Sequence, residues 1–350
     1  MDGYGQYSSC LTSALFEKGV SAKIVTSVSE KKARLAFLPD PLKLKRVHLF
    51  ALLYTCRILY RVKDVKTVDR IHTLVEAYAF IGYLLSKLLR KKHIITVHGT
   101  FSVNFFTYPI FGIFQKIAYR NADRIVCVSS YTERRLLEEY PLLKNTVVIP
   151  NGYGGPVSNG PRKRKGKRIL TVGAIKVRKG QELVVEAVKG LVKEMPDIEY
   201  HIFGSPYDVS HVQYLRKKVQ SLGLETHVFF NTNISKDELR EQYRSADLFV
   251  MPSISERFNF EGFGLVYLEA NAHGIPVIGA ADSGAEQAIK DGYNGFLVPQ
   301  KSVIDIQKRI EQLFNDPKLY TQMSACGLTW AKEHSWSNIA ENYMTTYRSL

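Results

Sequence analysis

The chain has 350 residues, too many for one ordinary hydrophobic core, so we expect two domains. Apolar residues make up 45% of it and the mean hydropathy is -0.13, which argues against an integral membrane protein. Residues 1–165 carry 27 Lys and Arg against 11 Asp and Glu, a net charge of +16, whereas residues 166–350 carry 21 against 22. The first half is therefore either a solvated basic surface or one that faces an anionic partner.

The chain shows no targeting or membrane-spanning pattern. The uncharged apolar run at residues 99–115 is 17 residues long and is interrupted by Asn104 and Pro109, so it is too short to predict a span. The first residues lack the basic-then-apolar order of a signal peptide. The four cysteines are far apart and form no C-x-x-C pair, which indicates reduced thiols. We therefore expect a cytoplasmic protein.

The first half begins with a short glycine loop at Gly3 and Gly5, followed by a helix-like run. Short apolar runs then alternate with helical segments such as residues 77–91, a pattern typical of βαβ units with a parallel sheet. The predicted strands of this half are residues 22–28, 69–74, 93–99, 124–129 and 146–152.

The clearest boundary is the Gly-, Pro- and Ser-rich segment 152–167, whose RKRK run we interpret as part of a solvated linker. Beyond it, a second set of strands is predicted at residues 168–173, 199–204, 227–231, 248–253, 275–280 and 295–298. Two doubly wound, Rossmann-like domains would then face a cleft, and ligands of such sheets lie at the carboxyl ends of the strands.

The most informative stretch is residues 252–298. A buried strand is followed by a glycine-rich loop and a helix, and Glu261 and Glu269 lie eight residues apart at the helix entry and two turns into it. Open backbone N–H groups at such a helix start favour a phosphate. The two carboxylates could hold neighbouring hydroxyls of a ribose and a sugar, although two glutamates on a helix are more often a solvated face.

This stretch closely resembles the signature of family 4 retaining glycosyltransferases, which have the two-domain GT-B fold. The matching strings are Pro252-Ser253, Glu261-Gly262-Phe263-Gly264, Leu268-Glu269-Ala270, Gly274-Ile275-Pro276-Val277-Ile278, Gly284 to Gln287 and Asp291-Gly292. The glutamate pair matches the family's E-x7-E motif.

Other segments extend the resemblance. Residues 172–180, VGAIKVRKG, resemble the first strand and loop of the family's second domain, which implies that Lys179 meets the nucleotide phosphates. The family usually has an arginine five residues before that lysine; this chain has Ala174, and Arg178 and Lys176 are candidates to replace it.

In the first domain, VHG at residues 97–99 resembles the segment whose histidine, here His98, reaches the transferred sugar. IPNG at 149–152 resembles the end of that domain, and residues 334–347 resemble a tail helix that returns to it. We therefore expect an acceptor domain over residues 1–152, a linker over 153–167, a sugar-nucleotide domain over 168–333, and a returning C-terminal helix over 334–350.

The family's first strand precedes a glycine loop, and residues 2–27 resemble the loop, helix and second strand that follow it, so we expect the first domain to lack its first strand. Three explanations stay open: a chain that starts further upstream, a sheet that closes without this strand, or an inactive relative.

The resemblance implies a retaining, metal-independent transfer of a hexose-type sugar from a UDP- or GDP-sugar, with no cofactor. Lys179 and Glu261 would be catalytic together with His98. The sugar donor would be bound by Gly3, Gly5, Arg178, Lys179, Glu261, Gly262, Phe263, Gly264, Leu265 and Glu269. Glu269 would hold the ribose, Glu261 the sugar hydroxyls, and the cation of Lys179 the leaving diphosphate.

The expected acceptor is a glycan or a lipid-linked molecule. The basic and aromatic segments 43–63 and 100–114 favour either an anionic membrane surface or buried helices, and a nucleic-acid partner is not expected. The main alternative is an inactive or truncated sugar-nucleotide-binding relative that acts as a scaffold. Phosphorolysis or epimerisation of a sugar nucleotide is a further alternative.

Overall fold

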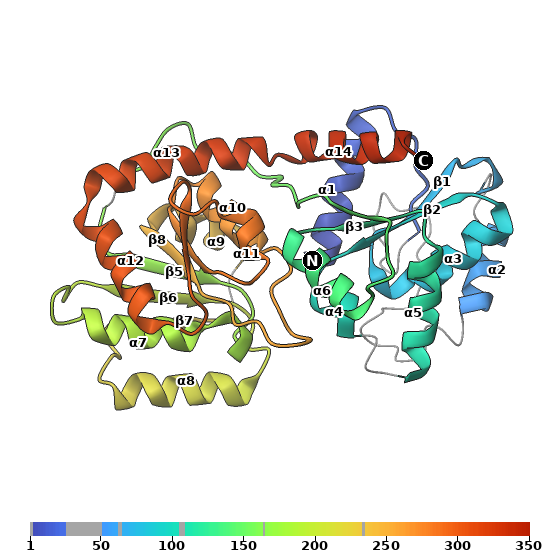
Figure 1. Cartoon of the computed structure of the whole chain (residues 1–350). Helices are drawn as coiled ribbons and strands as arrows, with labels where there is room; N and C mark the ends of the chain where they lie inside the picture. The colour runs from blue at the N-terminus through green and yellow to red at the C-terminus, as the bar shows by residue number, and fades with distance from the viewer. Residues whose placement is uncertain (1–2, 26–50, 62–64, 105–108, 164, 233–234) are drawn as a thin grey trace. The chain divides into compact units, whose positions relative to one another are not determined.

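The computed structural model describes residues 3–25, 51–61, 65–104, 109–163, 165–232 and 235–350. Its contacts divide the chain into a first unit, residues 1–152 with 336–350, and a second unit, residues 153–335. Figure 1 labels the helices and strands of both units. Each unit is built on its own parallel sheet.

The described part of the first unit has a sheet of four parallel strands in the order β1-β2-β3-β4. They are β1 (Arg70–Thr73), β2 (Lys92–Val97), β3 (Arg124–Cys127) and β4 (Thr146–Val148). These strands confirm the predictions at residues 69–74, 93–99, 124–129 and 146–152. Successive side chains of a strand point to opposite faces, so neighbouring residues of β2 enter different cores.

One face of this sheet is covered by α3 (Ala79–Leu89), α5 (Pro109–Asn121) and α6 (Ser130–Glu139). Ile95 and Val97 of β2 pack there with Tyr119 of α5 and Leu136 of α6. Helix α2 (Ala51–Arg61) packs on α3, through Ile58 and Leu85 among others. The short helix α4 (Thr100–Asn104) follows β2, and the 3-10 turns η2 (Val65–Thr67) and η3 (Glu76–Tyr78) flank β1.

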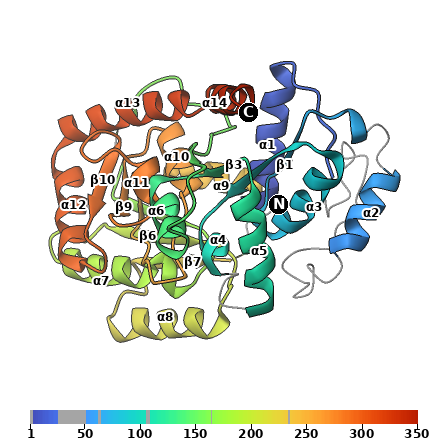
Figure 2. The ribbon, with the colours of Figure 1, turned by 45° about the vertical axis from the view of Figure 1, so that its right-hand side comes forward.

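The opposite face is covered by the two ends of the chain. Helices α1 (Gly3–Glu17) and α14 (Trp336–Arg348) lie side by side in Figures 1 and 2. Tyr7 and Leu11 of α1 and Trp336 and Tyr343 of α14 form one core with Ile94 of β2. The last residues of the chain therefore complete the core that its first residues begin.

A chain of buried and partly buried polar groups joins α1 and α14 to the sheet. The hydroxyls of Tyr7 and Tyr343 are 2.6 Å apart, and the Tyr7 hydroxyl also donates to Thr96 Oγ1 at 3.3 Å. His72 contacts the Tyr347 hydroxyl through Nδ1 at 2.7 Å and Thr96 Oγ1 through Nε2 at 2.8 Å. Buried polar groups need such partners, so these contacts specify where α14 sits.

The predicted loop at Gly3 and Gly5 is wrong, because both residues lie in the first turns of α1. Tyr7, Leu11, Ala14 and Leu15 recur at helical spacing and are all buried, and their burial stabilises a helix that starts at Gly3. Of the predicted strand at residues 22–28, residues 22–25 are not in a strand, and the rest lies outside the described residues.

The second unit has a sheet of six parallel strands in the order β10-β9-β8-β5-β6-β7. They are β5 (Arg168–Val172), β6 (Glu199–Phe203), β7 (Val228–Asn231), β8 (Leu248–Met251), β9 (Val277–Ala280) and β10 (Gly295–Val298). All six confirm predicted strands. The chain runs outward from β5 to β6 and β7 and then returns to β8 on the other side of β5. β5 and β8 therefore flank the point where the strand order reverses, and doubly wound sheets bind ligands at the carboxyl ends of the strands at such a point.

Helices cover both faces of this sheet. The main core includes residues of α7 (Gln181–Leu191), α8 (Val209–Ser221) and α12 (Val303–Asn315), and α7 and α12 lie against each other (Figure 2). Helices α9 (Lys236–Ser245) and α10 (Leu265–Ala272) place Tyr243 and Tyr267 on Phe249 of β8. Helix α10 packs against α13 (Pro317–Glu333), and α11 (Ala285–Ala288) follows β9.

The basic segment between the predicted domains belongs to the second unit. Backbone N–H groups of Ser158, Arg162 and Lys165 donate to Ala272 O, Ser324 Oγ and Asp247 Oδ1, each at 2.8 Å. The segment is therefore held along its length by α10, α13 and the residue before β8.

In the part of the chain that the structure describes, none of the helices combines the length and the apolar character needed to cross a membrane.

The first unit should lose stability on mild acidification. Burial lowers the pKa of His72 and His93 to about 3 and the pKa of His98 to about 4, against 6.5 for an ordinary histidine. Below pH 6.5 each of these histidines binds a proton in the unfolded chain but stays neutral in the folded unit. Each histidine therefore lowers the free energy of unfolding by up to about 1.4 kcal/mol per pH unit of acidification. Burial raises the pKa of Glu76 to about 7, against 4.5 for an ordinary glutamate. Between these two pH values, protonation of Glu76 stabilises the folded unit and offsets the effect of one histidine.

Unfolding in urea can be followed by fluorescence of the Trp330→Phe variant, which retains Trp336 of the first unit. The free energy of unfolding should fall between about pH 7.5 and about pH 5.5, and more steeply when Glu76→Gln removes the opposing carboxyl. A free energy of unfolding that stays constant or rises as the pH is lowered from about 7.5 to about 5.5 would contradict the neutral state assigned to the three histidines.

Candidate functional site

The loop after β5 carries two cations at the carboxyl ends of β5 and β8. It runs through the turn η5 (Val177–Lys179) to Gly180, which has φ +70° and is the N-cap residue of α7. A Cβ at Gly180 would overlap the carbonyl of Pro252. Glycine at this position therefore lets the loop after β5 approach the loop after β8 more closely than a residue with a side chain would. This close approach places Arg178 and Lys179 beside the loop that carries Glu261.

The loop after β8 is fixed by its own glycines. Gly264 has φ +84°, and a Cβ there would overlap the ring of Tyr267, whose hydroxyl donates to Met251 O at 2.5 Å. The N–H of Gly284 donates to the carbonyl of Glu261 at 2.8 Å. The backbone of Glu261 is therefore anchored between β8 and the loop after β9.

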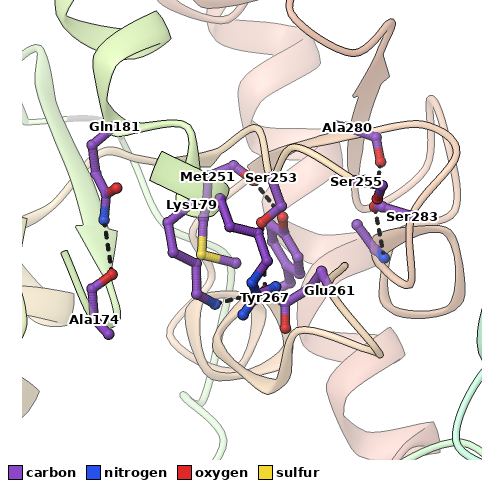
Figure 3. Close-up of polar contacts among 12 residues, drawn as sticks. Ala174, Lys179, Gln181, Met251, Ser253, Ser255, Glu261, Tyr267, Ala280 and Ser283 are labelled. Atoms are coloured by element: carbon purple, nitrogen blue, oxygen red, sulfur yellow. Dashed lines mark hydrogen bonds and ion pairs between the residues drawn. The ribbon is translucent and has the colours of Figure 1, made fainter. Parts of the chain in front are cut away.

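Glu261 is the centre of the site (Figure 3). Its Oε2 accepts from Lys179 Nζ at 2.6 Å and from Arg178 Nη1 at 2.9 Å, with Ser253 Oγ at 3.5 Å. The side chains of Glu261, Arg178 and Lys179 are each 12% exposed. Ion pairs this shielded are screened little by salt.

The charge of Glu261 depends on its partners. Burial by itself would raise the pKa of the carboxyl, but Lys179 and Arg178 bring the pKa down to about 2. Glu261 is therefore ionised at neutral pH. Two cations share one carboxylate oxygen, so the group carries excess positive charge and can attract a further anion.

The remaining predicted residues of this loop contribute mainly backbone. Gly262, Phe263 and Gly264 are buried, and the Phe263 side chain is only 2% exposed, so it belongs to the core. Leu265 begins α10, whose first N–H groups lie at the positive end of the helix.

Glu269 lies further along α10 and has different partners. The buried hydroxyl of Tyr243 donates to its Oε2 at 2.9 Å, and His273 Nδ1 contacts its backbone carbonyl at 2.8 Å. The expected ribose contact of Glu269 stays a prediction.

Ala174 stands where the resemblance leads us to expect an arginine. Its carbonyl accepts a hydrogen bond from Gln181 Nε2 at 3.2 Å (Figure 3).

His98 lies in the first unit, after β2. Its Nε2 contacts Leu74 O at 2.8 Å, its N–H donates to Glu76 Oε1 at 3.3 Å, and its ring meets the edges of Tyr4 and Tyr7. Burial lowers the pKa of His98 to about 4, so the imidazole is neutral. The roles expected of His98, Gly3 and Gly5 toward a sugar donor stay predictions.

Sequence reasoning missed the functional candidates Ser253, Tyr243 and Glu76. Ser253 was visible as part of the Pro-Ser string, directly after a buried strand. Glu76 follows β1 closely, and a carboxylate just beyond a parallel strand is a signal of the same kind. Tyr243 gave no signal, because it lies in α9 and meets Glu269 only through the fold.

Comparison with known proteins places the chain among sugar-transferring enzymes. Residues 1–153 match the family described as "Glycosyltransferase Family 4", and residues 158–329 match "Glycosyl transferases group 1". An uncharacterized glycosyltransferase of Methanocaldococcus jannaschii is 30% identical over 81% of this chain and 76% of its own. A GDP-mannose-dependent phosphatidylinositol monomannoside mannosyltransferase of Mycolicibacterium smegmatis is 27% identical over 73% of this chain and 69% of its own.

Solved structures share the fold. Sucrose-phosphate synthase from Thermosynechococcus elongatus superposes with a TM-score of 0.76 at 22% identity, over 99% of this chain and 93% of that one. Anabaena HepE in complex with UDP-glucose gives a TM-score of 0.70 at 19% identity, over 86% and 82%. With its two parallel-sheet units, the chain has the GT-B fold and belongs to glycosyltransferase family 4.

Proposed function

We propose that the chain transfers a hexose, with retention of configuration, from a nucleoside diphosphate sugar to a hydroxyl of a glycan or lipid-linked acceptor. The observation that carries this proposal is the group of Glu261, Lys179 and Arg178 at the carboxyl ends of β5 and β8. The name of the mycobacterial relative includes GDP-mannose, and HepE was solved with UDP-glucose, which supports a nucleotide-sugar donor.

The group suits departure of a nucleoside diphosphate. When the sugar–phosphate bond breaks, negative charge grows on the leaving oxygen, and fixed cations aimed at that charge lower the barrier. Lys179 and Arg178 are fixed cations of this kind, and the first N–H groups of α10 add a positive helix end. We assign to these protein groups the charge stabilisation that a metal ion supplies in other enzymes.

Glu261 would change partners during the cycle. In the described structure its carboxylate pairs with Lys179 and Arg178 and neutralises part of their charge, as the diphosphate would after binding. A bound diphosphate would compete for these two cations and leave the carboxylate available to accept from sugar hydroxyls. Glu269 would bind the ribose in the same way, with Tyr243 holding one of its oxygens.

We also propose that the first unit docks on an anionic membrane surface, where a lipid-linked acceptor would be found. Helices α2, α3 and α5 contain no acidic residue. Exposed apolar side chains lie among their cations: Leu53 is 60% exposed and Tyr60 89%, with the exposed Arg57 between them on the same face of α2. Cations attract anionic headgroups, and exposed apolar side chains can enter the interface.

The first test of the proposed function is release of nucleotide from a panel of UDP- and GDP-sugars. We expect the protein to release one nucleotide, and Glu269→Ala to lower this release by at least about tenfold through loss of the ribose contact. Release can be measured by coupled assay with and without glycan acceptors. No release, together with a thermal shift by one nucleotide, would favour the binding relative over the enzyme.

Glu261→Gln separates binding from chemistry. The amide removes the carboxylate that competes for Lys179 and Arg178, so UDP or GDP should bind at least as tightly, while turnover should fall by roughly 100-fold or more. Calorimetry measures the first effect and the release assay the second. The matched variant Lys179→Met should weaken nucleotide binding instead. Full turnover by Glu261→Gln would contradict the role given to this carboxylate.

Membrane docking can be tested by sedimentation with vesicles of phosphatidylglycerol and phosphatidylcholine at low salt. Leu53→Gln should reduce the bound fraction by several-fold, because it removes an apolar side chain from the docking face. Ile304→Gln is the matched control, since Ile304 is 64% exposed on the second unit. Absence of vesicle binding by the unmodified protein would overturn this part of the proposal.

A further inference from the structure

A third cation, Lys176, lies near the Glu261 group. It precedes the turn η5, and its Nζ is 4.6 Å from the ring centroid of Tyr207. Arg178 and Lys179 repel its charge, and Glu261 attracts it. Among the residues that the structure describes, Lys176 makes no ion pair with a carboxylate, and Glu261 Oε2 is already occupied by the other two cations.

The loop that holds Lys176 is well anchored. The N–H of Gly173 donates to Phe203 O at 2.8 Å, and the N–H of Ile175 donates to Ser205 O at 3.0 Å. Gly204 lies so close to Gly173 that a Cβ on it would overlap the Gly173 carbonyl. The loops after β5 and β6 are thus joined, with Lys176 of one against Tyr207 of the other.

The charges of this group do not balance. Arg178 and Lys179 pair with the single carboxylate of Glu261, and Lys176 is close enough to interact electrostatically with all three groups. The four side chains together carry a net charge of about +2 when Lys176 is protonated. Partial burial and the repulsion by Arg178 and Lys179 lower the pKa of Lys176 to about 8. Repulsion between like charges in a partly buried loop is unfavourable, and a bound anion of equal and opposite charge would offset it.

We propose that Lys176 is a third cationic ligand of the diphosphate of the sugar donor. The diphosphate of a nucleotide sugar carries about two negative charges at neutral pH, which is the charge that the Glu261 group lacks. The inference rests on the proposed function, because it assigns a further residue to the same donor site. Without Lys176 the group would carry about one positive charge and would only half neutralise its ligand.

Binding of a diphosphate should then add protons to the protein. Near pH 8 about half of the Lys176 side chains are neutral, and a bound anion favours their protonation. Isothermal titration with UDP, GDP and ADP in two buffers of different ionisation enthalpy measures this uptake directly. We expect the unmodified protein to bind one of these nucleotides with uptake of up to about half a proton per site.

Two variants and one control give the test its specificity. Lys176→Met should weaken binding of that nucleotide about 10- to 100-fold and abolish the uptake. Lys176→Arg should bind within about threefold of the unmodified protein without proton uptake, because a guanidinium is always charged. Lys217→Met, which removes an exposed lysine of α8, should change neither quantity. Thermal melting of each variant checks that it is folded.

The possible failures are distinguishable. If the unmodified protein binds a nucleotide and Lys176→Met binds it equally well with the same uptake, the role of Lys176 is overturned while the donor site stands. If Lys176→Arg takes up the same proton as the unmodified protein, another group titrates and the inference is again overturned. If the unmodified protein binds none of the three nucleotides, the proposed donor site itself fails.

Discussion

The second unit depends on one interaction, the sharing of the Glu261 carboxylate by Lys179 and Arg178. A carboxylate this shielded would be costly if it were unpaired, so the loops after β5 and β8 must meet closely enough to supply both cations. Gly180 permits this approach, because any side chain there would overlap the backbone of Pro252. The glycines of the loops are thus a condition for the charge arrangement.

In the first unit, the two faces of the sheet are covered by segments from distant parts of the sequence. Helices α1 and α14 share one core, and buried hydroxyls together with the partly buried imidazole of His72 join them to β1 and β2. Apolar packing provides most of the stabilisation, while the polar chain favours the observed position of α14, because its groups find their hydrogen-bond partners there.

The sequence allowed the strands of both sheets to be predicted because buried parallel strands are continuous apolar runs, as in Leu248–Met251. The motif around Glu261 predicted a donor site, and the structure brings Glu261 together with Lys179 and Arg178, which were predicted for the same site. The glycine loop at Gly3 and Gly5 was wrong because the glycines were given more weight than the helical spacing of Tyr7, Leu11 and Leu15. The partners of Glu261 could not be predicted, because they come from segments 82 and 83 residues away and meet only through the order of the strands.

The position of α14 has a consequence for synthesis of the protein. Residues 1–152 leave the ribosome well before residues 336–350, which belong to the same unit. At roughly 5–20 residues per second, the sheet face that α14 covers waits roughly 10–40 s for its last helix. During that time Ile94, Val126 and the inner side of α1 lack Trp336 and Tyr343, their apolar partners. The second unit can fold as its chain emerges, whereas the first unit, although its synthesis starts earlier, is completed only when residues 336–350 have been made.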